Sequence, residues 1–322
     1  MAALEARAHY RGGVSIVFLG TSDFAAAVLE RLAREQQLRP ALVITRPDRP
    51  AGRGRRLTAP PVAVRARESG LRVEQPASVN GEDARALIAG AASAGSAAAG
   101  RQILVVCAFG ALIKEPLLSE HEILNVHPSL LPRWRGAAPV ERAIMAADER
   151  TGVSIMQLTA GLDSGPVCLA QAEPITAQDT YESLARRLQG LGGELLVRAL
   201  QQRPDFRAQS EEGVTYAEKI GPADRLLDPA RPAVELERVV RALHPHIGAR
   251  VALEDGTMLG VERAALAGEA SPTRAPGVFG EDGRLLLAGT PGLLELLVVK
   301  PPGARAMDAA AYLRGHAAAG RR

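Results

Sequence analysis

Three polar side chains occupy positions where chemistry could take place. Asn125 and His127 lie two residues apart at the end of an apolar run, and Asp163 follows in a glycine-flanked turn, TAGLDSG. Because successive side chains of a strand point to opposite faces, residues 125 and 127 share one face. An amide and an imidazole there need hydrogen-bond partners if they are buried. The spacing alone is equally compatible with a catalytic pair and with a structural polar pair.

The types of these residues favour one class of chemistry. An aspartate beside a histidine fixes the orientation of the ring, and an asparagine amide can stabilise a developing oxyanion. No serine or cysteine is placed as a nucleophile near His127, and Ser129 is too close in sequence to be an obvious partner. We therefore expect a substrate amine to attack a carbonyl carbon directly, without a covalent acyl-enzyme.

Short apolar runs predict the strands that position these residues. They cover residues 14–19, 41–45, 71–73, 103–107 and 123–127, and helical patterns stand between them. This alternation predicts an α/β fold with a mostly parallel sheet. Two further strands, at 152–158 and 166–172, are expected as an antiparallel pair that ends the sheet. The first turn, GTSDF, lacks the GxGxxG pattern of a dinucleotide site.

A change of pattern near residue 203 predicts a second domain. A long amphipathic helix at 181–201 precedes a polar linker at 203–220, and a helix at 233–243 then leads into short runs typical of a small β-barrel. We expect a disordered extension at 1–13, one domain at 14–202 and a β-barrel domain at 221–322. The alanine-rich tract at 89–100 has little to bury and predicts a flexible surface segment.

Residues 46–61, RPDRPAGRGRRLTAPP, form a dense basic segment. Five arginines in residues 46–56 stand against one acid, Asp48. Prolines and glycines at this density exclude a helix or a central strand, so we expect a long exposed loop. One interpretation is a solvated arginine-rich loop. The other is contact with a phosphate backbone, because guanidinium groups match phosphate oxygens.

Composition limits the class of protein. The 322 residues suffice for more than one domain, and the net charge of +3 gives no global nucleic-acid signature. Cys107 and Cys168 lie in apolar runs without metal-ligand spacing. They are expected to be buried, reduced thiols of a cytoplasmic protein without a metal. No apolar run reaches the length of a membrane helix, so no membrane partner is expected.

Several motifs resemble those of the folate-dependent formyltransferases. NVHPSLLPRWRGAAP begins at Asn125, and AGLDSG contains Asp163. Further similar stretches are FLGTSDFA, RPDRPAGRGRRL, AFGALI, VTYAEKI and KPPGARAM. The resemblance covers nearly the whole chain except residues 1–13 and the alanine-rich tract. Within the family, the arginine segment and the TYAEK linker favour the branch that acts on tRNA. The stretch after TYAEKI lacks the Ile-Asp-Trp that the family often shows, which leaves the packing of the linker open.

The resemblance implies a reaction and its partners. It implies 10-formyltetrahydrofolate as the formyl donor and the α-amino group of methionyl initiator tRNA as the acceptor, with no metal. The product would be the N-formylmethionyl-tRNA used in translation initiation. It implies a Rossmann-like, mostly parallel N-terminal domain followed by an OB-like C-terminal barrel that binds tRNA. We expect the enzyme to be a monomer.

The resemblance also assigns roles by position. Asn125 and protonated His127 stabilise the oxyanion, while Asp163 orients His127 and, through a water, helps to move the proton of the amine. The residues implied in folate binding are Ser129, Leu130, Leu131, Pro132, Phe109 and Ile113. The residues implied in tRNA binding are Arg46, Arg49, Arg53, Arg55 and Arg56.

Two other functions are weighed against this one. A formyltransferase acting on a nucleotide sugar or another small amine would share the first domain and its polar residues. A folate- or RNA-binding protein without catalysis would not need all three of Asn125, His127 and Asp163, and their joint presence argues against it.

Overall fold

The structure is a computed structural model that describes residues 14–51, 54, 56–94, 101–269 and 275–315. The predicted extension at 1–13, the end of the alanine-rich tract at 95–100, and Arg53 and Arg55 lie outside the described residues. The chain forms two compact units, and each combines several stretches of sequence. The first contains residues up to Arg135, Gly152–Glu173 and Arg186–Thr215, and the second contains Gly136–Thr151, Pro174–Ala185 and the chain from Tyr216.

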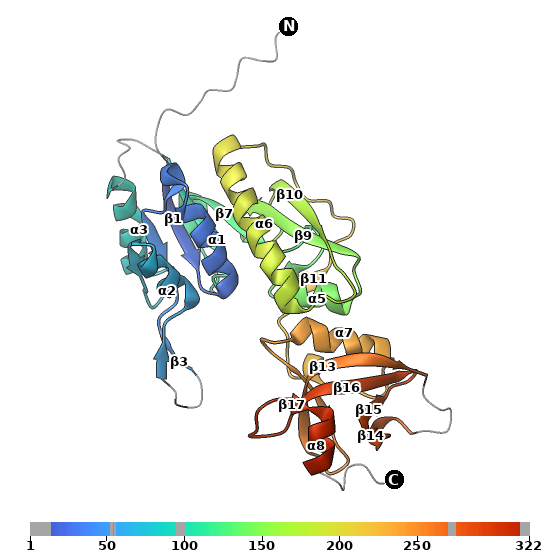
Figure 1. Cartoon of the computed structure of the whole chain (residues 1–322). Coiled ribbons are helices and arrows are strands. Elements are labelled where there is room, and N and C mark those ends of the chain that lie inside the picture. The colour runs from blue at the N-terminus through green and yellow to red at the C-terminus, as the bar shows by residue number, and fades with distance from the viewer. Residues whose placement is uncertain (1–13, 52–53, 55, 95–100, 270–274, 316–322) are drawn as a thin grey trace. The chain divides into compact units, whose positions relative to one another are not determined.

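A mostly parallel sheet is the scaffold of the first unit (Figure 1). Among the described residues its strand order is β10-β9-β7-β6-β1-β2-β5. Neighbours from β5 to β7 are parallel, whereas β9 is antiparallel to β7. The strands are β1 (Ser15–Gly20), β2 (Leu42–Ile44), β5 (Val73–Glu74), β6 (Gln102–Cys107), β7 (Glu122–His127), β9 (Arg150–Gln157) and β10 (Val167–Pro174). The predicted mostly parallel α/β fold is confirmed.

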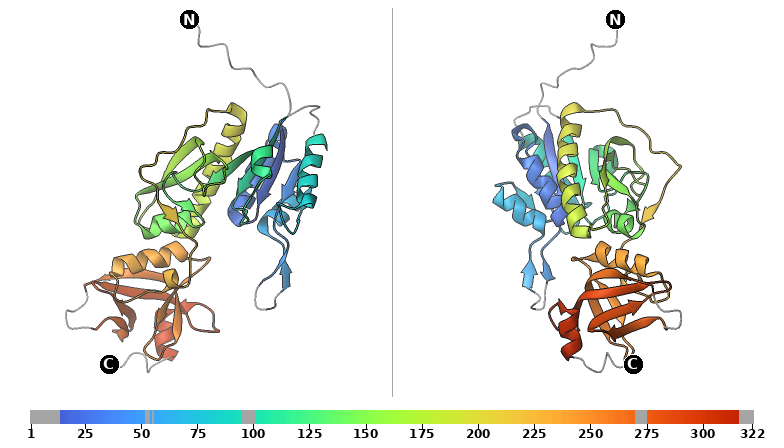
Figure 2. Two further views of the ribbon diagram at one scale, coloured as in Figure 1. Left: turned by 180° about the vertical axis from the view of Figure 1, so that it is seen from behind. Right: turned by 45° about the vertical axis from the view of Figure 1, so that its right-hand side comes forward.

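Helices cover both faces of this sheet (Figure 2). Their bounds are α1 (Asp23–Ala33), η1 (Gln36–Leu38), α2 (Pro61–Glu68), α3 (Glu82–Ala94), α4 (Leu117–Glu120) and α6 (Tyr181–Gln202). α6 lies on the same face as α1, because a Cβ added at Gly192 would be 3.1 Å from Val126 of β7 and 3.7 Å from Phe24 of α1. α3 and α4 share a buried apolar cluster with the opposite face.

The first strand, turn and helix of the described chain follow from the types of their residues. All six residues of β1 are buried, as expected for a strand with neighbours on both sides and helices on both faces. Gly20 permits a close turn, because a Cβ there would lie 2.7 Å from the Phe18 ring. Ser22 caps α1 by accepting a hydrogen bond from the Ala25 amide at 3.3 Å. The predicted strand, turn and helix are therefore present.

The basic segment differs from its prediction. It forms an antiparallel hairpin of β3 (Arg49–Ala51) and β4 (Arg56–Thr58), in which Pro50 is paired with Leu57. Proline is tolerated because both strands of an isolated ribbon are edges. The hairpin extends away from the sheet of its unit (Figures 1 and 2). The predicted exposure is correct, whereas the predicted absence of regular structure is wrong.

The alanine-rich tract also differs from its prediction over the part that is described. Helix α3 continues to Ala94, so residues 89–94 are helical rather than a flexible segment. Alanine has the highest intrinsic helix propensity and loses no side-chain entropy, which favours continuation of a helix that is already formed.

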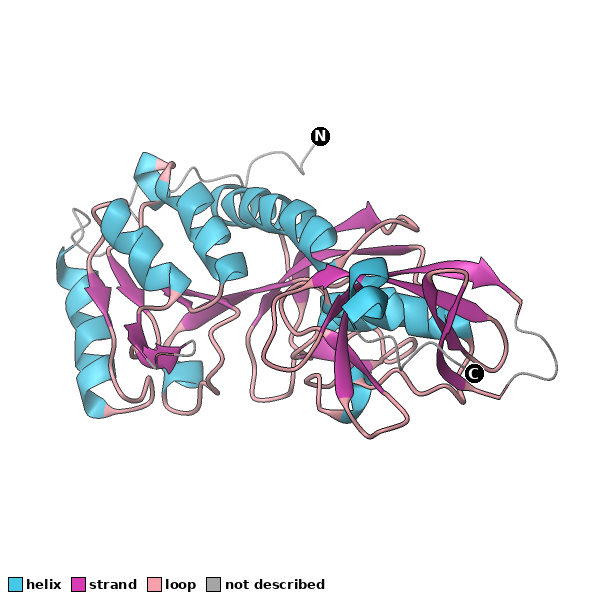
Figure 3. Cartoon of the chain, turned by 60° about the horizontal axis from the view of Figure 1, so that its bottom comes forward, coloured by secondary structure: helices cyan, strands magenta, loops and turns pink. Residues whose placement is uncertain are grey.

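The second unit is built on a curled antiparallel sheet (Figure 3). Its order over the described residues is β12-β13-β16-β15-β14, with β17 paired to β16. The strands are β12 (Ala249–Ala252), β13 (Met258–Gly268), β14 (Gly277–Glu281), β15 (Arg284–Ala288), β16 (Leu293–Lys300) and β17 (Met307–Asp308). Register shifts between β13 and β16 mark bulges, which bend and twist a strand. The predicted small β domain is confirmed as a half-barrel.

Helices fill the core of the second unit. α7 (Ala233–Leu243) and α8 (Ala309–Gly315) contribute buried residues to the apolar cluster beneath the curled sheet. α5 (Pro139–Met145), although earlier in the chain, belongs to this unit, and Met145 packs against the same cluster. Arg142 of α5 donates to Asp224 at 2.7 Å, which ties α5 to η2 (Ala223–Arg225).

The predicted linker at 203–220 is held by hydrogen bonds. The amides of Val167 and Arg207 each donate to the other residue's carbonyl oxygen, at 2.8 and 2.9 Å. Further along, β8 (Arg135–Gly136) pairs with β11 (Tyr216–Ala217). These are contacts of the backbone, so they do not come from the polar side chains that suggested a linker. The domain boundaries on either side of it stay a prediction.

Candidate active site

Strand β7 carries the first two residues of the site. Asn125 and His127 share a face with Ile123, which belongs to the cluster under α3 and α4. Both lie at the carboxyl end of the strand and are only 8% and 4% exposed. Polar side chains buried to this degree require hydrogen-bond partners.

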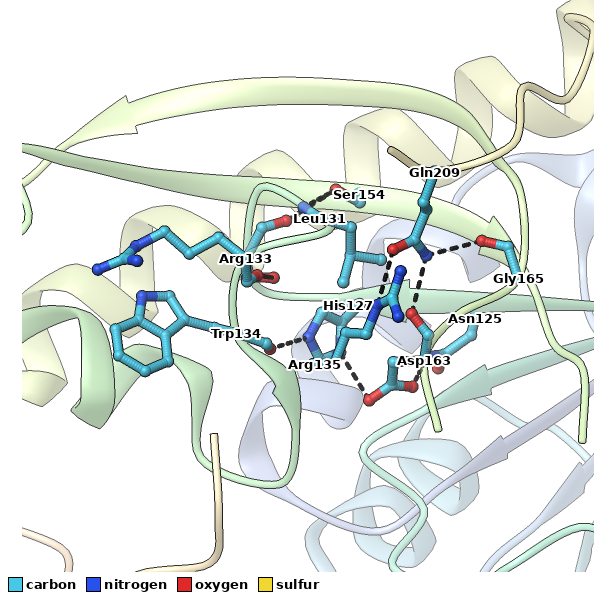
Figure 4. A network of polar contacts seen from close by, with 11 residues as sticks. Asn125, His127, Leu131, Arg133, Trp134, Arg135, Ser154, Asp163, Gly165 and Gln209 are labelled. Atoms are coloured by element: carbon cyan, nitrogen blue, oxygen red, sulfur yellow. Dashed lines mark hydrogen bonds and ion pairs between the residues drawn. The ribbon is translucent and has the colours of Figure 1, made fainter. Parts of the chain in front are cut away.

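Asp163 reaches this pair from the turn between β9 and β10 (Figure 4). Its Oδ1 accepts a hydrogen bond from Asn125 Nδ2 at 3.4 Å, and its Oδ2 lies 3.7 Å from His127 Nδ1. The second distance exceeds a hydrogen bond and makes an ion pair when the ring is protonated. Asp163 has a φ of +43°, a left-handed conformation that costs a non-glycine residue about 1 kcal/mol or more. The structure brings the three predicted residues together.

The other ring nitrogen of His127 is held by the backbone. Its Nε2 lies 2.8 Å from the carbonyl oxygen of Trp134 (Figure 4). Because a carbonyl oxygen only accepts, Nε2 carries a proton in this contact, and Nδ1 faces Asp163. Trp134 has a φ of +63°, a second left-handed position in the site. The orientation of the imidazole ring is therefore fixed from both sides.

The proline-bounded loop after β7 is fixed by two hydroxyl groups. Ser129 is fully buried and donates from Oγ to the Arg133 carbonyl oxygen at 2.7 Å. Ser154 of β9 donates to the Ser129 carbonyl oxygen at 2.7 Å and accepts from the Leu131 amide at 3.2 Å. The loop is therefore an ordered wall beside His127.

Gln209, which the sequence did not single out, holds the turn that carries Asp163. Its Nε2 donates to the carbonyl oxygens of Asp163 at 2.8 Å and Gly165 at 2.7 Å (Figure 4). Arg135, 6% exposed, donates from Nε to Gln209 Oε1 at 3.0 Å. Gln209 stands 46 residues from Asp163 in the chain, inside the predicted linker, and no local pattern marks it.

The hydroxyl and thiol groups nearest in sequence are not activated nucleophiles. The Ser129 hydroxyl is bonded to the backbone of its own loop. Burial raises the pKa of the Cys107 thiol, and burial is also the largest cause that raises the pKa of Cys168. Both thiols are therefore protonated near neutral pH. The arrangement around His127 suits stabilisation of an oxyanion during direct attack.

The described part of the chain contains neither a metal-binding cluster nor a membrane-spanning helix. No group of three or more histidine, cysteine, aspartate or glutamate side chains there is arranged to hold a metal ion. No helix in that part is long and apolar enough to cross a membrane.

The residues expected to bind folate lie at the ends of β6 and β7. The loop at 129–132 contains the buried Ser129 and three half-buried residues, Leu130, Leu131 and Pro132. Phe109 and Ile113 follow β6 and are only 4% and 5% exposed, because they belong to the apolar cluster of the sheet. Their role in folate binding stays a prediction.

Three of the arginines expected to bind tRNA are described. Arg49 and Arg56 are exposed on the hairpin, and Arg46 is half-buried at its base. Gln75 fixes that base by donating to the Arg46 carbonyl oxygen at 2.8 Å and to Asp48 Oδ1 at 2.7 Å. Exposed guanidinium groups on a projecting hairpin are accessible to a large anionic partner.

Sequence comparison defines the class of protein. Residues 14–200 match the formyl transferase family, and residues 219–317 match the C-terminal domain of formyl transferases. The chain belongs to the formyl transferase family.

Relatives of similar length carry a more specific name. The methionyl-tRNA formyltransferase of Halorhodospira halophila is 42% identical over 309 residues, which cover 93% of this chain and 96% of that protein. The methionyl-tRNA formyltransferase of Cereibacter sphaeroides is 41% identical over 308 residues, which cover 94% of this chain and 96% of that protein.

Solved structures share the fold at low sequence identity. A methionyl-tRNA formyltransferase from Clostridium thermocellum has a TM-score of 0.56 at 13% identity, covering 79% of this chain and 94% of its own. An N-formyltransferase from Helicobacter canadensis, in complex with folinic acid and dTDP-3-aminofucose, has a TM-score of 0.62 at 14% identity. That likeness covers 91% of this chain and 100% of its own. Both likenesses concern the fold alone.

Proposed function

We propose that the chain transfers the formyl group of 10-formyltetrahydrofolate to the α-amino group of methionyl initiator tRNA. The product, N-formylmethionyl-tRNA, serves translation initiation. The observation that carries the proposal is 42% identity over 93% of the chain to a methionyl-tRNA formyltransferase. The position of Asn125, His127 and Asp163 around the end of β7 supports it.

Asn125 and His127 act on the oxygen of the formyl group. The α-amino nitrogen attacks the formyl carbon, and the formyl oxygen becomes an oxyanion. Asn125 and protonated His127 donate hydrogen bonds to it. Because the Trp134 carbonyl holds Nε2, the proton that His127 offers is on Nδ1, beside Asp163.

Proton movement completes the transfer. Collapse of the tetrahedral intermediate breaks the bond between the formyl carbon and N10 of the folate. The attacking nitrogen releases one proton and N10 accepts one, so tetrahydrofolate leaves. Asp163 orients His127 and assists the proton movement through a water, a role for which a carboxylate at this position is suited.

Two arginine clusters support an RNA acceptor. The first is the hairpin with Arg49 and Arg56. The second lies in the other unit, where Arg225 and Arg250 line a pocket of about 350 Å³ together with apolar residues and no acid. Burial, and then repulsion from Arg250, lowers the pKa of Arg225. Arg225 already donates from Nε and Nη2 to the carbonyl oxygens of Gly248 and Ile247. The exposed Arg250 is therefore the guanidinium group that suits a phosphate, beside apolar surface that suits a nucleoside.

The proposal includes a monomeric enzyme in the cytoplasm. Cys107 and Cys168 are free thiols; Cys107 is buried as predicted, whereas Cys168 is only half-buried. Free thiols are usual in proteins of a reducing compartment, and the proposed tRNA substrate is made there.

A formylation assay tests the proposal. The purified chain is incubated with 10-formyltetrahydrofolate and either methionyl initiator tRNA or a nucleotide-linked amino sugar, and each formylated product is quantified. We expect formylation of the tRNA and none of the sugar. Formylation of the sugar alone would replace the proposal by the alternative acceptor, and folate binding without any formylated product would exclude catalysis of either reaction.

A further inference from the structure

We infer that Gln209 is a positioning residue for the reaction: its side-chain amide holds the turn that presents Asp163 to Asn125 and His127. The inference rests on the proposed function, in which Asp163 acts at the reaction centre. Gln209 acts indirectly: it holds the backbone of the turn and does not contact the reacting atoms.

The amide of Gln209 is used completely at this one place. Both protons of Nε2 are donated, to Asp163 O at 2.8 Å and to Gly165 O at 2.7 Å. Oε1 accepts from Arg135 Nε at 3.0 Å. Because a guanidinium group can only donate, it faces the oxygen of the amide and thereby directs Nε2 toward the turn. A residue without both donors and an acceptor could not replace this arrangement.

The turn needs such support because its conformation is unfavourable. Asp163 has a φ of +43°, which a residue with a side chain adopts only when its surroundings impose it. Gly165 also packs closely against the backbone of β9, since a Cβ there would lie 1.9 Å from Gln157 O. The two carbonyl oxygens bonded to Gln209 lie on either side of Ser164, in the second half of the turn. Loss of these two hydrogen bonds lets Asp163 move away from Asn125 and His127.

Arg135 joins the two sides of the site. Its side chain orients Gln209, and its backbone neighbour, Trp134, supplies the carbonyl oxygen that holds His127 Nε2. Arg135 is also bound through its own amide to Thr215 O at 2.9 Å. One short segment therefore supports His127 directly and Asp163 through Gln209.

The decisive variant is Gln209→Glu, which keeps the shape and the acceptor for Arg135 but turns both donors into an acceptor. We expect kcat with methionyl initiator tRNA to fall about a hundredfold, the scale associated with a misplaced catalytic group, with KM for folate and tRNA within about twofold. The thermal midpoint should fall by only a few degrees, because two hydrogen bonds of a half-buried side chain are lost. Gln202→Glu, the same change at an exposed position on α6, is the matched control and should leave kcat unchanged.

A double-mutant cycle separates positioning from general destabilisation. In an Asp163→Asn background, Gln209→Glu should lower kcat by less than about twofold, because its route of action is already lost. An equal loss of kcat in both backgrounds, or a Gln209→Glu enzyme with wild-type kcat, would overturn the inference. If Gln209→Glu does not fold, Gln209→Met, which removes the hydrogen bonds at similar size, takes its place. A wild-type enzyme without formylating activity would instead overturn the proposed function, whereas a fully active Asp163→Asn enzyme would overturn the role proposed for Asp163.

Discussion

Two residues of the site adopt the left-handed backbone conformation, which is unfavourable for residues with a side chain. Asp163 and Trp134 have φ values of +43° and +63°. Each costs about 1–3 kcal/mol, and such residues persist where neighbouring structure imposes them. Both direct a group at His127, one a carboxylate and the other a carbonyl oxygen. The two residues with an unfavourable backbone conformation are thus the ones that orient the His127 ring before the substrate binds.

Asp163 offers the most direct test at this scale. We expect Asp163→Ala and Asp163→Asn to lower kcat by about 10²–10⁴-fold, the range for a group that takes part in proton transfer. Folate affinity, measured by titration with a non-reactive folate, should change little. Asp205→Asn, at an exposed position, serves as the control. Turnover near the wild-type level in either Asp163 variant would refute the proposed role.

Among the elements, the β3–β4 hairpin is distinct from the sheet that it accompanies. It forms a two-stranded sheet of its own, and its exposed arginines do not contribute to the apolar core. The α5 helix shows the opposite behaviour, since Arg142 bonds to both carboxylate oxygens of Asp224, at 2.7 and 3.1 Å. The described arginines of the hairpin are therefore exposed to solvent, whereas the arginine of α5 stabilises the fold of its unit.

The hairpin arginines predict an effect on the acceptor alone. We expect the double variant Arg49→Ala/Arg56→Ala to raise KM for methionyl initiator tRNA about tenfold or more, because each lost phosphate contact removes electrostatic attraction. The affinity for folate should not change. Arg198→Ala, an exposed arginine on α6, is the matched control. Equal losses of tRNA and folate affinity would contradict a contact of the hairpin with tRNA.

The Arg142–Asp224 pair predicts a pH dependence of stability. The hydrogen bond from Arg142 is the largest cause that lowers the pKa of Asp224 from its usual 3.8. Its stabilising contribution is therefore complete above that pH and is lost as the pH falls through the lower folded value. Asp224→Asn should reduce the free energy of unfolding near neutral pH by about 1 kcal/mol for this partly exposed pair.

Chemical denaturation across the acid range checks this expectation. The difference in unfolding free energy between the wild type and Asp224→Asn should shrink as the pH drops below 3.8. A difference that stays constant from neutral to strongly acid pH would show that the carboxylate charge contributes nothing.

Across the whole molecule, the excess of positive charge is small, but it is concentrated in a few places. The net charge is only +3, yet five arginines stand against one acid in residues 46–56, and a pocket in the second unit contains two more arginines. We therefore expect the proposed tRNA substrate, which carries many phosphates, to be attracted mainly to these places.

Salt dependence measures this concentration of charge. We expect KM for tRNA to rise steeply with ionic strength, and the slope of its logarithm against that of salt to decrease by about one for each phosphate contact removed. The Arg49→Ala/Arg56→Ala variant and an Arg250→Ala variant should each show a shallower slope. A slope identical to the wild type in both would place the contacts elsewhere.

The features that the sequence predicts depend on residues close together in the chain. The features that it does not predict, such as the contacts of Gln209, depend on residues far apart in the chain. The buried strand β1, the helix α6 and the face shared by Asn125 and His127 follow from local periodicity, and each is found. Asn125 and His127 could be anticipated because β7 is a parallel strand whose carboxyl end lies at the ligand-binding edge of the sheet. The approach of Asp163 could not be derived in this way, because β9 is antiparallel to β7 and its last residue, Gln157, pairs with Leu124. Gln209 could not be anticipated either, because its partners are distant in sequence and a single glutamine has no pattern. The hairpin was missed because Pro50 excludes a central strand but not an edge strand.

The separateness of the β3–β4 hairpin makes it a natural cassette for engineering. Its ladder runs from Arg49–Thr58 to Ala51–Arg56 and leaves the strand order of the main sheet unchanged. Grafting this segment from one relative into another therefore exchanges an exposed surface without changing the residues of the apolar core. Chimaeras of this kind would test whether the hairpin sets acceptor preference independently of the polar residues at the end of β7.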